Sequence, residues 1–357
     1  MGLKVGLVGV GPVGDMIIRV LRERNFPIDG KIIVMATSER TEVLGGESFL
    51  VRKISAELFK ELDLVFFAGK EGAQGASVQW GKIAVDNGCV VIDNGGDFRM
   101  HPDYPLVIPE VNMDAVTKDT RHICNPNCST IQMVVALAPL HKVARLHRVV
   151  VSTYQSVSGF GGAAMDQLKD EMNQVVEGKV PETDSRIFAH PMASNCLPHI
   201  DRFMANGYTK EEMKMVNETR KILNEPNLLI NPTTVRIPVL VGHSESVNAE
   251  FMGEMTAEKA LEILSDPRQS PGVIVIDGPT GDTQGKDIRK DPLERQYPTA
   301  MDLKEDQYKD AVLVGRIRDD STARNAINLW CVSDNLRKGA ATNAVQIAEA
   351  MLERGLL

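Results

Sequence analysis

The chain opens on Leu3-Lys4-Val5-Gly6-Leu7-Val8-Gly9-Val10-Gly11-Pro12-Val13-Gly14, an apolar run that passes directly into a glycine-rich turn. Apolar residues at positions 16, 17, 20 and 21 follow with the spacing of one helix face. A strand, a G-x-G-x-x-G turn and a helix in this order form a dinucleotide-binding fingerprint, because the glycines let the backbone approach a pyrophosphate. A purely structural glycine-rich turn is the alternative. The fingerprint predicts a dinucleotide site at Gly9, Gly11, Pro12, Val13 and Gly14.

The first third of the chain alternates strand-like and helix-like segments. After the opening strand, strands are expected at residues 31–36, 62–68 and 89–93, with a helix at residues 73–85. Such alternation is typical of a parallel sheet with helices on both faces. The predicted fold class is therefore α/β, with a Rossmann-type nucleotide-binding domain.

The pattern of predicted elements changes after residue 146, where strands outnumber helices. We expect strands at 148–154, 234–241, 244–250, 311–317 and 326–332, helices at 209–223 and 257–264, and loops at 279–286. This pattern indicates a second, α+β domain for catalysis and dimerisation. An amphipathic helix at 340–354 returns the chain to its first domain. The expected domains are residues 1–130 plus 338–357, and residues 131–337.

Composition limits the classes of partner. A net charge of −8 over 357 residues argues against nucleic acid or an anionic membrane as the main partner. The five cysteines are scattered and form neither a disulfide framework nor a zinc-binding spacing, so no metal site is expected. The sequence shows no signal peptide and no apolar stretch of membrane-spanning length. We expect a soluble cytoplasmic protein.

The end of the second expected strand bears on cofactor choice. An NAD site usually places an acidic residue there to hold the ribose hydroxyls. This chain continues instead with Ala36-Thr37-Ser38-Glu39-Arg40-Thr41. The hydroxyls of Thr37, Ser38 and Thr41 and the charge of Arg40 suit a 2′-phosphate, which favours NADP. The alternative is that Arg40 is a solvated surface residue.

A cysteine stands at the start of a long apolar helix pattern. The segment Asn125-Pro126-Asn127-Cys128-Ser129-Thr130 precedes the apolar residues 131–146, and Ser129 and Thr130 are residue types that cap helices. Cys128 would then lie at or just before the helix amino end, where unpaired N–H groups and the helix dipole favour a thiolate. A thiolate can act as a covalent nucleophile. The alternative is a small buried hydrophobic residue.

Two further pairs of residues could serve that nucleophile. Arg236 and His243 are expected to begin and end one strand, with a bend at Gly242, although a lone histidine is more often structural. Glu211 and Lys214 are three residues apart on the expected helix 209–223 and face the same way. Spacing alone favours an ordinary surface ion pair for them.

Several strings together resemble the aspartate-β-semialdehyde dehydrogenase family over essentially the whole chain. These strings are Pro105–Asn112, Asn125–Gln132, Val151–Gly159, Arg236–Ser244 and Val332–Ala341. Their order and spacing are specific, whereas each string alone is not. The resemblance implies a homodimeric, NADP-dependent enzyme that interconverts aspartyl phosphate and aspartate semialdehyde through a cysteine thioester, with inorganic phosphate as co-substrate.

The resemblance also implies a role for each matched position. Cys128 is the nucleophile, His243 the general acid/base and Gln155 the amide that orients the covalent intermediate. The substrate carboxylate is held by Arg236 and its ammonium group by Glu211. Phosphate is bound by Arg99 and Lys214, with Asn127 as a hydrogen-bond donor. Further cofactor contacts fall on Ser158, Gly159, Asn335 and Gln346.

The chain departs from the usual family pattern at two places, and rival functions stay open. The glycine turn is one residue tighter than the common G-x-x-G-x-x-G, and Asp97 lies in a string where hydroxyl residues are usual. An N-acetylglutamyl-phosphate reductase shares the thioester chemistry, but Glu211 and the Asn-Cys-Ser-Thr string argue against it. A catalytically silent NADP-binding paralogue is the other alternative, although Cys128, Arg236 and His243 are all present.

Overall fold

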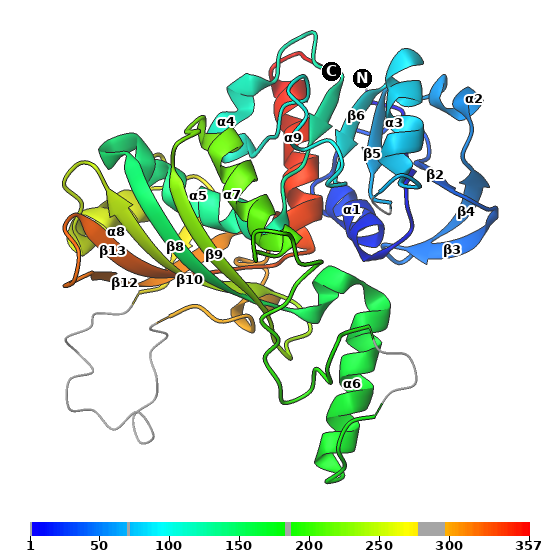
Figure 1. Cartoon of the computed structure of the whole chain (residues 1–357). Coiled ribbons are helices and arrows are strands. Elements are labelled where there is room, and N and C mark those ends of the chain that lie inside the picture. The colour runs from blue at the N-terminus through cyan, green and yellow to red at the C-terminus, as the bar shows by residue number, and fades with distance from the viewer. Residues whose placement is uncertain (1, 70–71, 183–186, 278–296) are drawn as a thin grey trace. The chain divides into compact units, whose positions relative to one another are not determined.

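The computed structural model describes residues 2–69, 72–182, 187–277 and 297–357 (Figure 1). The chain divides into two compact units. Unit 1 comprises Met1–Cys128 and Gly339–Leu357, and unit 2 comprises Ser129–Lys338. The loops expected at 279–286 lie outside the described residues. Among the described helices, none combines the length and the apolar character needed to cross a bilayer.

Within the described residues, unit 1 contains a sheet of seven strands in the order β3-β4-β2-β1-β5-β6-β7. Their bounds are β1 Val5–Val8, β2 Ile33–Ala36, β3 Arg40–Leu44, β4 Glu47–Lys53, β5 Leu64–Phe67, β6 Val90–Asp93 and β7 His122–Cys124. All neighbours are parallel except β3 and β4. The order from β4 to β7 is that of the doubly wound dinucleotide fold, whose ligand crevice opens where the strand order reverses, beside β1.

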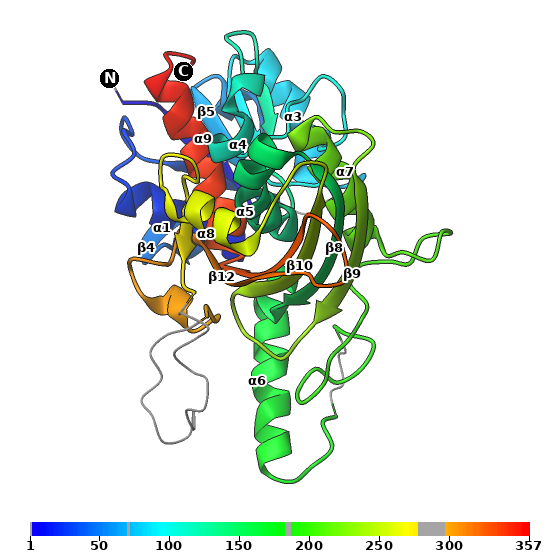
Figure 2. The same ribbon diagram turned by 90° about the vertical axis from the view of Figure 1, so that its left-hand side faces the viewer.

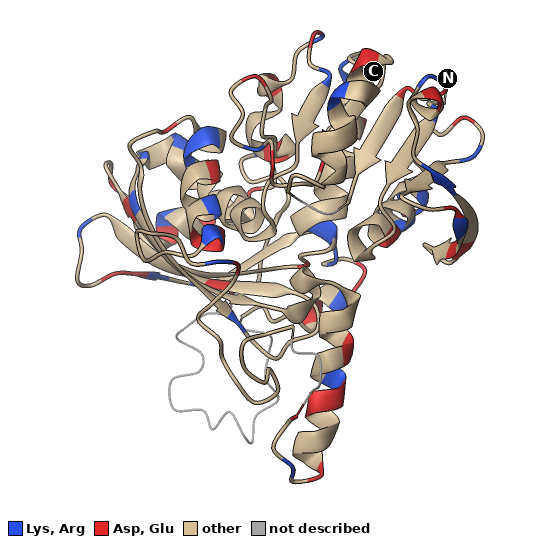
Figure 3. Cartoon of the chain, turned by 45° about the vertical axis from the view of Figure 1, so that its right-hand side comes forward, with Lys and Arg blue, Asp and Glu red and all other residues tan. Residues whose placement is uncertain are grey.

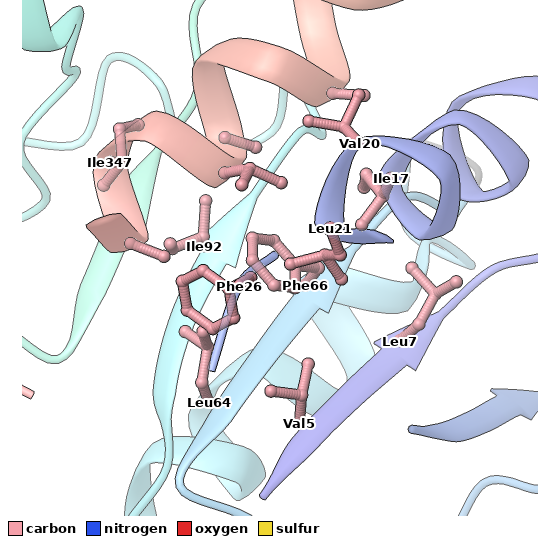
Figure 4. Packing of buried hydrophobic residues seen from close by; sticks show 14 of the residues in the cluster. Val5, Leu7, Ile17, Val20, Leu21, Phe26, Leu64, Phe66, Ile92 and Ile347 are labelled. Carbon is pink, nitrogen blue, oxygen red and sulfur yellow. The ribbon is translucent and has the colours of Figure 1, made fainter. Parts of the chain in front are cut away.

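Strands β1, β5, β6 and β7 of unit 1 are buried on both faces, as the apolar runs of the first three predict. On one face, α1 (Pro12–Glu23) and α9 (Thr342–Glu353) pack over Leu7, Phe66 and Ile92 (Figure 4). The next residues along the same strands point to the opposite face. There α2 (Ala56–Phe59) and α3 (Ala76–Asp86) supply Phe59 and Ala84 to a second cluster. The α/β class with a parallel-sheet nucleotide-binding domain is therefore confirmed.

In the part of the chain that is described, unit 2 contains a mixed sheet of six strands in the order β11-β12-β13-β10-β8-β9. Their bounds are β8 Leu146–Gln155, β9 Leu229–Arg236, β10 His243–Phe251, β11 Val273–Val275, β12 Val312–Asp319 and β13 Ala326–Ser333. Helices α5 (Cys128–Ala144), α7 (Lys210–Leu223) and α8 (Ala257–Ser265) lie on one side of this sheet (Figures 1 and 2). Helix α6 (Gly162–Val176) lies on the other side and carries charges of both signs (Figure 3).

Helix α5 is the central helix of unit 2. Its residues from Ser129 to Leu140 are all buried, including Pro139. A helix that is apolar all round belongs in a protein core. Its start differs from the expectation, because Cys128 is the first helical residue, so Ser129 and Thr130 belong to the first turn and do not cap it. It ends at Ala144, since β8 begins at Leu146.

The expected strand at 234–241 is wrong. Strand β9 ends at Arg236, and His243 begins β10. Pro238 has no N–H for a sheet ladder and Gly242 has a φ of +97°, so the chain turns between them. The true strand includes Pro232 and lies at the sheet edge, where proline is tolerated.

The segment after β2, for which no element was expected, contains a hairpin. Arg40 and Thr41 begin β3, which pairs with β4 in a hairpin. Gly45 and Gly46 form its turn, both with positive φ, as a tight two-residue hairpin loop requires. Strand β11 and helix α6 were not expected either. The remaining helices and strands that the sequence predicted within the described residues are present, with ends shifted by a few residues.

The amino end of α7 is fixed by a capping box. The Thr209 Oγ1 accepts a hydrogen bond from the Glu212 N–H at 3.2 Å, and Glu212 Oε2 accepts one from the Thr209 N–H at 2.7 Å. Glu212 Oε1 also accepts from the backbone N–H of Thr234 on β9, at 3.0 Å. These bonds attach the first turn of α7 to β9.

We predict that Thr209→Ala lowers the free energy of unfolding by about 2 kcal/mol, near the upper end for a lost helix cap. The cap is buried and shares its glutamate with β9. Thr256→Ala, which removes the exposed cap of α8, is the matched control and should cost about 1 kcal/mol or less. Urea-induced unfolding measures both. Equal losses would show that the attachment to β9 adds nothing.

Candidate active site

The predicted nucleophile lies at the first residue of a buried helix. Cys128 is half-buried and begins α5, and Asn127, which precedes it, is 6% exposed. Helix α5 runs for 17 residues, so its amino-terminal N–H groups and dipole favour a negative charge at this point. Such a position favours the thiolate form of a cysteine.

Gln155 ends β8 and connects three residues of unit 2 through its side-chain amide. Its Nε2 donates to Ser129 Oγ at 2.8 Å, to Glu211 Oε1 at 3.3 Å and to Thr153 Oγ1 at 3.4 Å. Since Ser129 follows Cys128 directly, the amide predicted to orient an intermediate is tied to the first turn of α5. The sequence contains no signal that singled out Ser129 for this contact.

Arg236 and His243 meet beside Gly159. Arg236 ends β9, is 4% exposed and donates from Nη1 to the carbonyl oxygen of Ser156 at 2.6 Å. A Cβ atom on Gly159 would lie 3.1 Å from Arg236 Nη1 and 3.6 Å from the His243 ring. The glycine therefore leaves the space that brings the guanidinium and the imidazole together.

The hydrogen bonds of His243 define which ring nitrogen carries the proton. Nδ1 accepts from the backbone N–H of Ser156 at 3.1 Å, so it must present a lone pair. In the neutral ring the hydrogen is then on Nε2. Complete burial, followed by the nearby charge of Arg236, lowers the pKa of His243 to about 3, although Glu211 opposes this shift. His243 is thus neutral at ordinary pH, with Nε2–H as a hydrogen-bond donor.

Glu211 and Lys214 are not the ordinary surface pair that their spacing favoured. Glu211 is 5% exposed, and its Oε2 lies 3.2 Å from Lys214 Nζ. Lys214 also pairs with Asp201 at 3.3 Å. Because Glu211 contacts Gln155 and influences His243 electrostatically, it belongs to the same cluster.

Ser158 and Asn335, which were predicted to contact the cofactor, contact one another. Asn335 Nδ2 donates to Ser158 Oγ at 2.9 Å, and Asn335 Oδ1 accepts from the Gly242 N–H and from Ser156 Oγ, each at 3.0 Å. Both side chains are buried. Asn335 therefore holds the turn whose Ser156 fixes the His243 ring.

In unit 1, the glycine turn has the geometry that a pyrophosphate requires. Gly9 has a φ of +113°, and a Cβ on Gly14 would lie 2.3 Å from the Gly9 carbonyl oxygen, so the first strand and α1 need glycine at both places. A Cβ on Gly11 would meet nothing within 4 Å, which leaves open space over the helix amino end. Pro12 and Val13 are the first helical residues there. These residues fit a bound dinucleotide.

The segment after β2 presents an arginine beside hydroxyl groups. Arg40 Nη1 donates to Ser38 Oγ at 3.1 Å and to the Ser38 carbonyl at 3.2 Å, and its Nε pairs with Glu42 at 2.7 Å. Thr37, Ser38 and Thr41 are exposed and Arg40 is half-buried. The group suits a phosphate, but Glu42 partly offsets the charge.

The remaining predicted residues of unit 1 lie after β6 and on α9. Arg99 is buried and donates from Nη2 to the Asn94 carbonyl at 2.9 Å. The unusual Asp97 accepts from the Gly72 N–H at 3.0 Å, which gives it a structural role in this loop. Gln346 is half-buried on α9.

Asp93, His122 and Cys124 carry potential metal-ligand atoms within 4.8 Å of one another. Asp93 Oδ1 already accepts from Ser77 Oγ at 2.6 Å and from the Gly95 N–H at 2.8 Å, and its Oδ2 lies 3.4 Å from His122 Nε2. Hydrogen bonds thus account for the buried carboxylate without a metal.

Comparisons with known proteins identify the protein class to which this chain belongs. Residues 4–119 match the family model described as semialdehyde dehydrogenase, NAD binding domain, and residues 137–338 match the one described as semialdehyde dehydrogenase, dimerisation domain. The nucleotide-binding sheet and the second, mixed-sheet unit are therefore those of a semialdehyde dehydrogenase with a nicotinamide cofactor.

Individual relatives indicate which semialdehyde dehydrogenases this chain is similar to in sequence and structure. The chain is 44% identical to aspartate-semialdehyde dehydrogenase of Aquifex aeolicus over 100% of both proteins, and 42% identical to aspartate-semialdehyde dehydrogenase 2 of Vibrio cholerae over 96% of this chain and 95% of that protein. It is similar to the crystal structure of aspartate semialdehyde dehydrogenase II from Vibrio cholerae, with a TM-score of 0.85, 41% identity and 99% of both chains covered; that enzyme has also been crystallised complexed with ASA. The chain belongs to the aspartate-semialdehyde dehydrogenase family and is an enzyme of that family.

We predict that Gly159→Ala lowers kcat/KM for aspartate semialdehyde about ten-fold or more, because small displacements of working groups are costly. The added methyl would press on Arg236 Nη1 and the His243 ring. Gly162→Ala is the control, since a Cβ there meets nothing within 4 Å. Steady-state assays and circular dichroism of both variants test this. Unchanged kinetics of Gly159→Ala would mean that the ring and guanidinium tolerate displacement.

Proposed function

We propose that the enzyme interconverts L-aspartyl-4-phosphate and L-aspartate-4-semialdehyde with NADP, as in lysine, threonine and methionine biosynthesis. The observation that carries this proposal is the buried cluster of Gln155, Glu211, Arg236 and His243, tied to the first turn of α5 through Ser129. The Vibrio cholerae relative complexed with ASA, which we take as aspartate semialdehyde, supports the choice of substrate.

The charges of the cluster match a zwitterionic amino acid. Arg236 offers a planar fork of donors to the substrate carboxylate, which arginine binds better than lysine. Glu211 offers a carboxylate to the substrate ammonium group. An acylated amine would have no use for that carboxylate, so the cluster favours an aspartate derivative over an N-acetylglutamate derivative. Lys214 and Arg99 supply the positive charges for phosphate, with Asn127 as a donor.

In the oxidative direction the Cys128 thiolate adds to the aldehyde carbon and the carbonyl oxygen becomes an oxyanion. A nicotinamide cofactor held at the glycine turn of unit 1 would supply the acceptor for the hydride that this carbon loses. The sulfur is then joined to an acyl carbon as a thioester. Phosphate attacks that carbon, the C–S bond breaks, and the thiolate leaves to begin the next cycle. The proton released overall is the one that the hydrogen phosphate carried.

His243 serves these steps as a neutral donor. Its Nε2–H would donate a hydrogen bond to the developing oxyanion. Its Nδ1 meanwhile accepts a hydrogen bond from the backbone N–H of Ser156. General base action on the Cys128 thiol would require the ring to lose the Ser156 hydrogen bond. The dipole of α5 favours the thiolate without that base. Gln155 orients the same intermediate from the end of β8.

NADP preference rests on Arg40 and its hydroxyl neighbours. Gly9, Gly11, Pro12, Val13 and Gly14 would hold the pyrophosphate, and Thr37, Ser38, Arg40 and Thr41 would hold the 2′-phosphate. Ser158, Gly159, Asn335 and Gln346 would contact the rest of the cofactor. The open space over Gly11 and the contact between Arg40 and Ser38 support this assignment.

A homodimer built through unit 2 is part of the proposal. Residues 137–338 match a model described as a dimerisation domain. Unit 2 also exposes large apolar side chains, among them Phe160, Val176 and Val180. An exposed apolar surface of this kind is typical of a protein–protein interface. We assign units 1 and 2 as the nucleotide-binding domain and the catalytic and dimerisation domain.

The decisive experiment is NADP reduction on L-aspartate semialdehyde with and without inorganic phosphate. We expect phosphate-dependent turnover that Cys128→Ala abolishes while NADP binding is retained. Cys196→Ala, which removes an exposed cysteine, is the control and should keep full activity. Turnover on N-acetylglutamate semialdehyde alone would favour the reductase alternative. No turnover on either aldehyde would indicate a catalytically silent paralogue.

We predict that Arg40→Ala raises the KM for NADP about ten-fold, in keeping with the loss of one charge-assisted phosphate contact of about 1.5 kcal/mol, and leaves the KM for NAD nearly unchanged. Arg354→Ala, which removes another arginine of unit 1 that pairs with Asp114, is the control. Initial rates with both cofactors measure the ratio. Equal changes for NADP and NAD would exclude Arg40 as the 2′-phosphate ligand.

A further inference from the structure

Glu245 is a buried carboxyl group that the reaction scheme above does not use. It lies on β10 and is 0% exposed, and among the described residues neither of its carboxyl oxygens has a hydrogen-bond partner or an ion pair. In the sheet it is paired with Thr153 of β8 on one side and with Cys331 of β13 on the other. An unpaired carboxylate in such a place would be costly.

Gln132 of α5 is the polar residue that faces it. Gln132 is 1% exposed, and within the described parts of the chain its Nε2 also lacks a hydrogen-bond partner. The Gln132 amide acts on the Glu245 carboxyl as a hydrogen-bond donor and lowers its pKa, although the pair falls short of strict hydrogen-bond geometry. A small shift of either side chain would pair them, and pairing would satisfy both groups.

The buried position of Glu245 favours its neutral form. Burial raises the pKa of Glu245 well above its ordinary value, and Gln132 opposes the rise. The groups packed beside it are Thr153, Gln132 and the Cys331 thiol, whose own pKa is raised by burial and by Glu245. His243, two residues away on β10, is neutral as well. A neutral acid can donate to an amide oxygen and accept from the amide nitrogen, so it complements a glutamine.

The positions of the two residues connect them to the working groups. Glu245 follows His243 by two residues and therefore points to the same face of β10. Gln132 follows Cys128 by four residues and lies one turn further along the same side of α5. A second link, from Ser129 to Gln155 of β8, attaches the preceding turn of the helix. Both links join the first turns of α5 to the ends of the strands that carry Gln155 and His243.

We propose that Glu245 and Gln132 form a buried acid–amide pair that positions the start of α5, and with it Cys128, against the start of β10. This inference rests on the proposed function in taking Cys128 and His243 as the working groups. Glu245 is a positioning residue and touches no substrate. An apolar pair of the same volume would stabilise a core at least as well, so the polar pair contributes orientation instead of stability.

The test compares Glu245→Gln with Glu245→Met in a Cys196→Ser background, which leaves Cys128 as the accessible thiol. Glu245→Gln keeps the amide partner and should retain kcat within about two-fold. Glu245→Met leaves the Gln132 amide without its partner, so it should lose some stability, lose kcat about ten-fold with an unchanged KM, and change the pH profile of Cys128 alkylation by iodoacetamide. Gln132→Met should reproduce the Glu245→Met result, and the double variant should lose no more.

Val247→Ala is the packing control on the same strand face. It removes buried methyl groups and lowers stability, but it should leave kcat and the alkylation profile unchanged. The pH dependence of the free energy of unfolding provides a second test of the Glu245 carboxyl group. The pKa of Glu245 is raised on folding, so its contribution is present below pH 4.5 and is lost as the pH rises. Glu245→Gln should therefore gain stability over the parent above about pH 4.5, and the gain should vanish below it.

Two results would overturn the proposal: full kcat and an unchanged alkylation profile in Glu245→Met, or a loss in Glu245→Gln as large as in Glu245→Met. The second would show that a charged carboxylate acts there. If Glu245→Met does not fold, Gln132→Met provides the same readouts. If the parent enzyme fails to turn over aspartate semialdehyde, the proposed function fails, while the alkylation profiles still decide whether the pair positions Cys128.

Discussion

The burial of α5 against the sheet of unit 2 is the constraint on which the proposed chemistry depends. The helix is buried at every residue from Ser129 to Leu140, so its axis is fixed by the core. Cys128 is its first residue and therefore sits where the peptide dipoles leave a positive end. A nucleophile on a loop would have neither the fixed direction nor the electrostatic help. The position of the thiol that we propose as the nucleophile is thus a consequence of how the helix is packed.

The polar residues around that helix form a layer between α5 and the sheet. Gln155 binds Ser129 and Glu211, and Arg236 and His243 converge on Gly159. Opposite charges are kept a short distance apart in a buried place, where their fields are weakly screened. Such a layer costs stability and suits a small substrate that carries both charges. The core of the unit supplies the rigidity that holds the charges apart.

The sequence determined the fold class and much of the candidate site, and the reasons for the errors are physical. Strands β1, β5 and β6 are apolar on both faces, so their runs were recognised, whereas the polar, exposed strands β3 and β4 were not. The strand with Pro232 was misplaced because proline is tolerated only at an edge, and a single sequence does not show which strand lies at the edge. Glu211 and Lys214 have the spacing of a surface pair, and only the packing of α7 on β9 reveals that the glutamate is buried. Contacts such as Ser129 with Gln155 join residues far apart in the chain, and no local pattern encodes them.

His243 shows how the chemistry open to a predicted site residue depends on its neighbours. The motif predicts a histidine that exchanges protons, and a free imidazole would do so near pH 6.5. Here Ser156 directs its backbone N–H at Nδ1, Asn335 fixes the turn that holds Ser156, and burial removes the ring from water. Those three conditions leave a neutral ring with its hydrogen on Nε2. A neutral ring that donates from Nε2 suits a developing oxyanion, and stabilising that oxyanion is the role that we propose for His243.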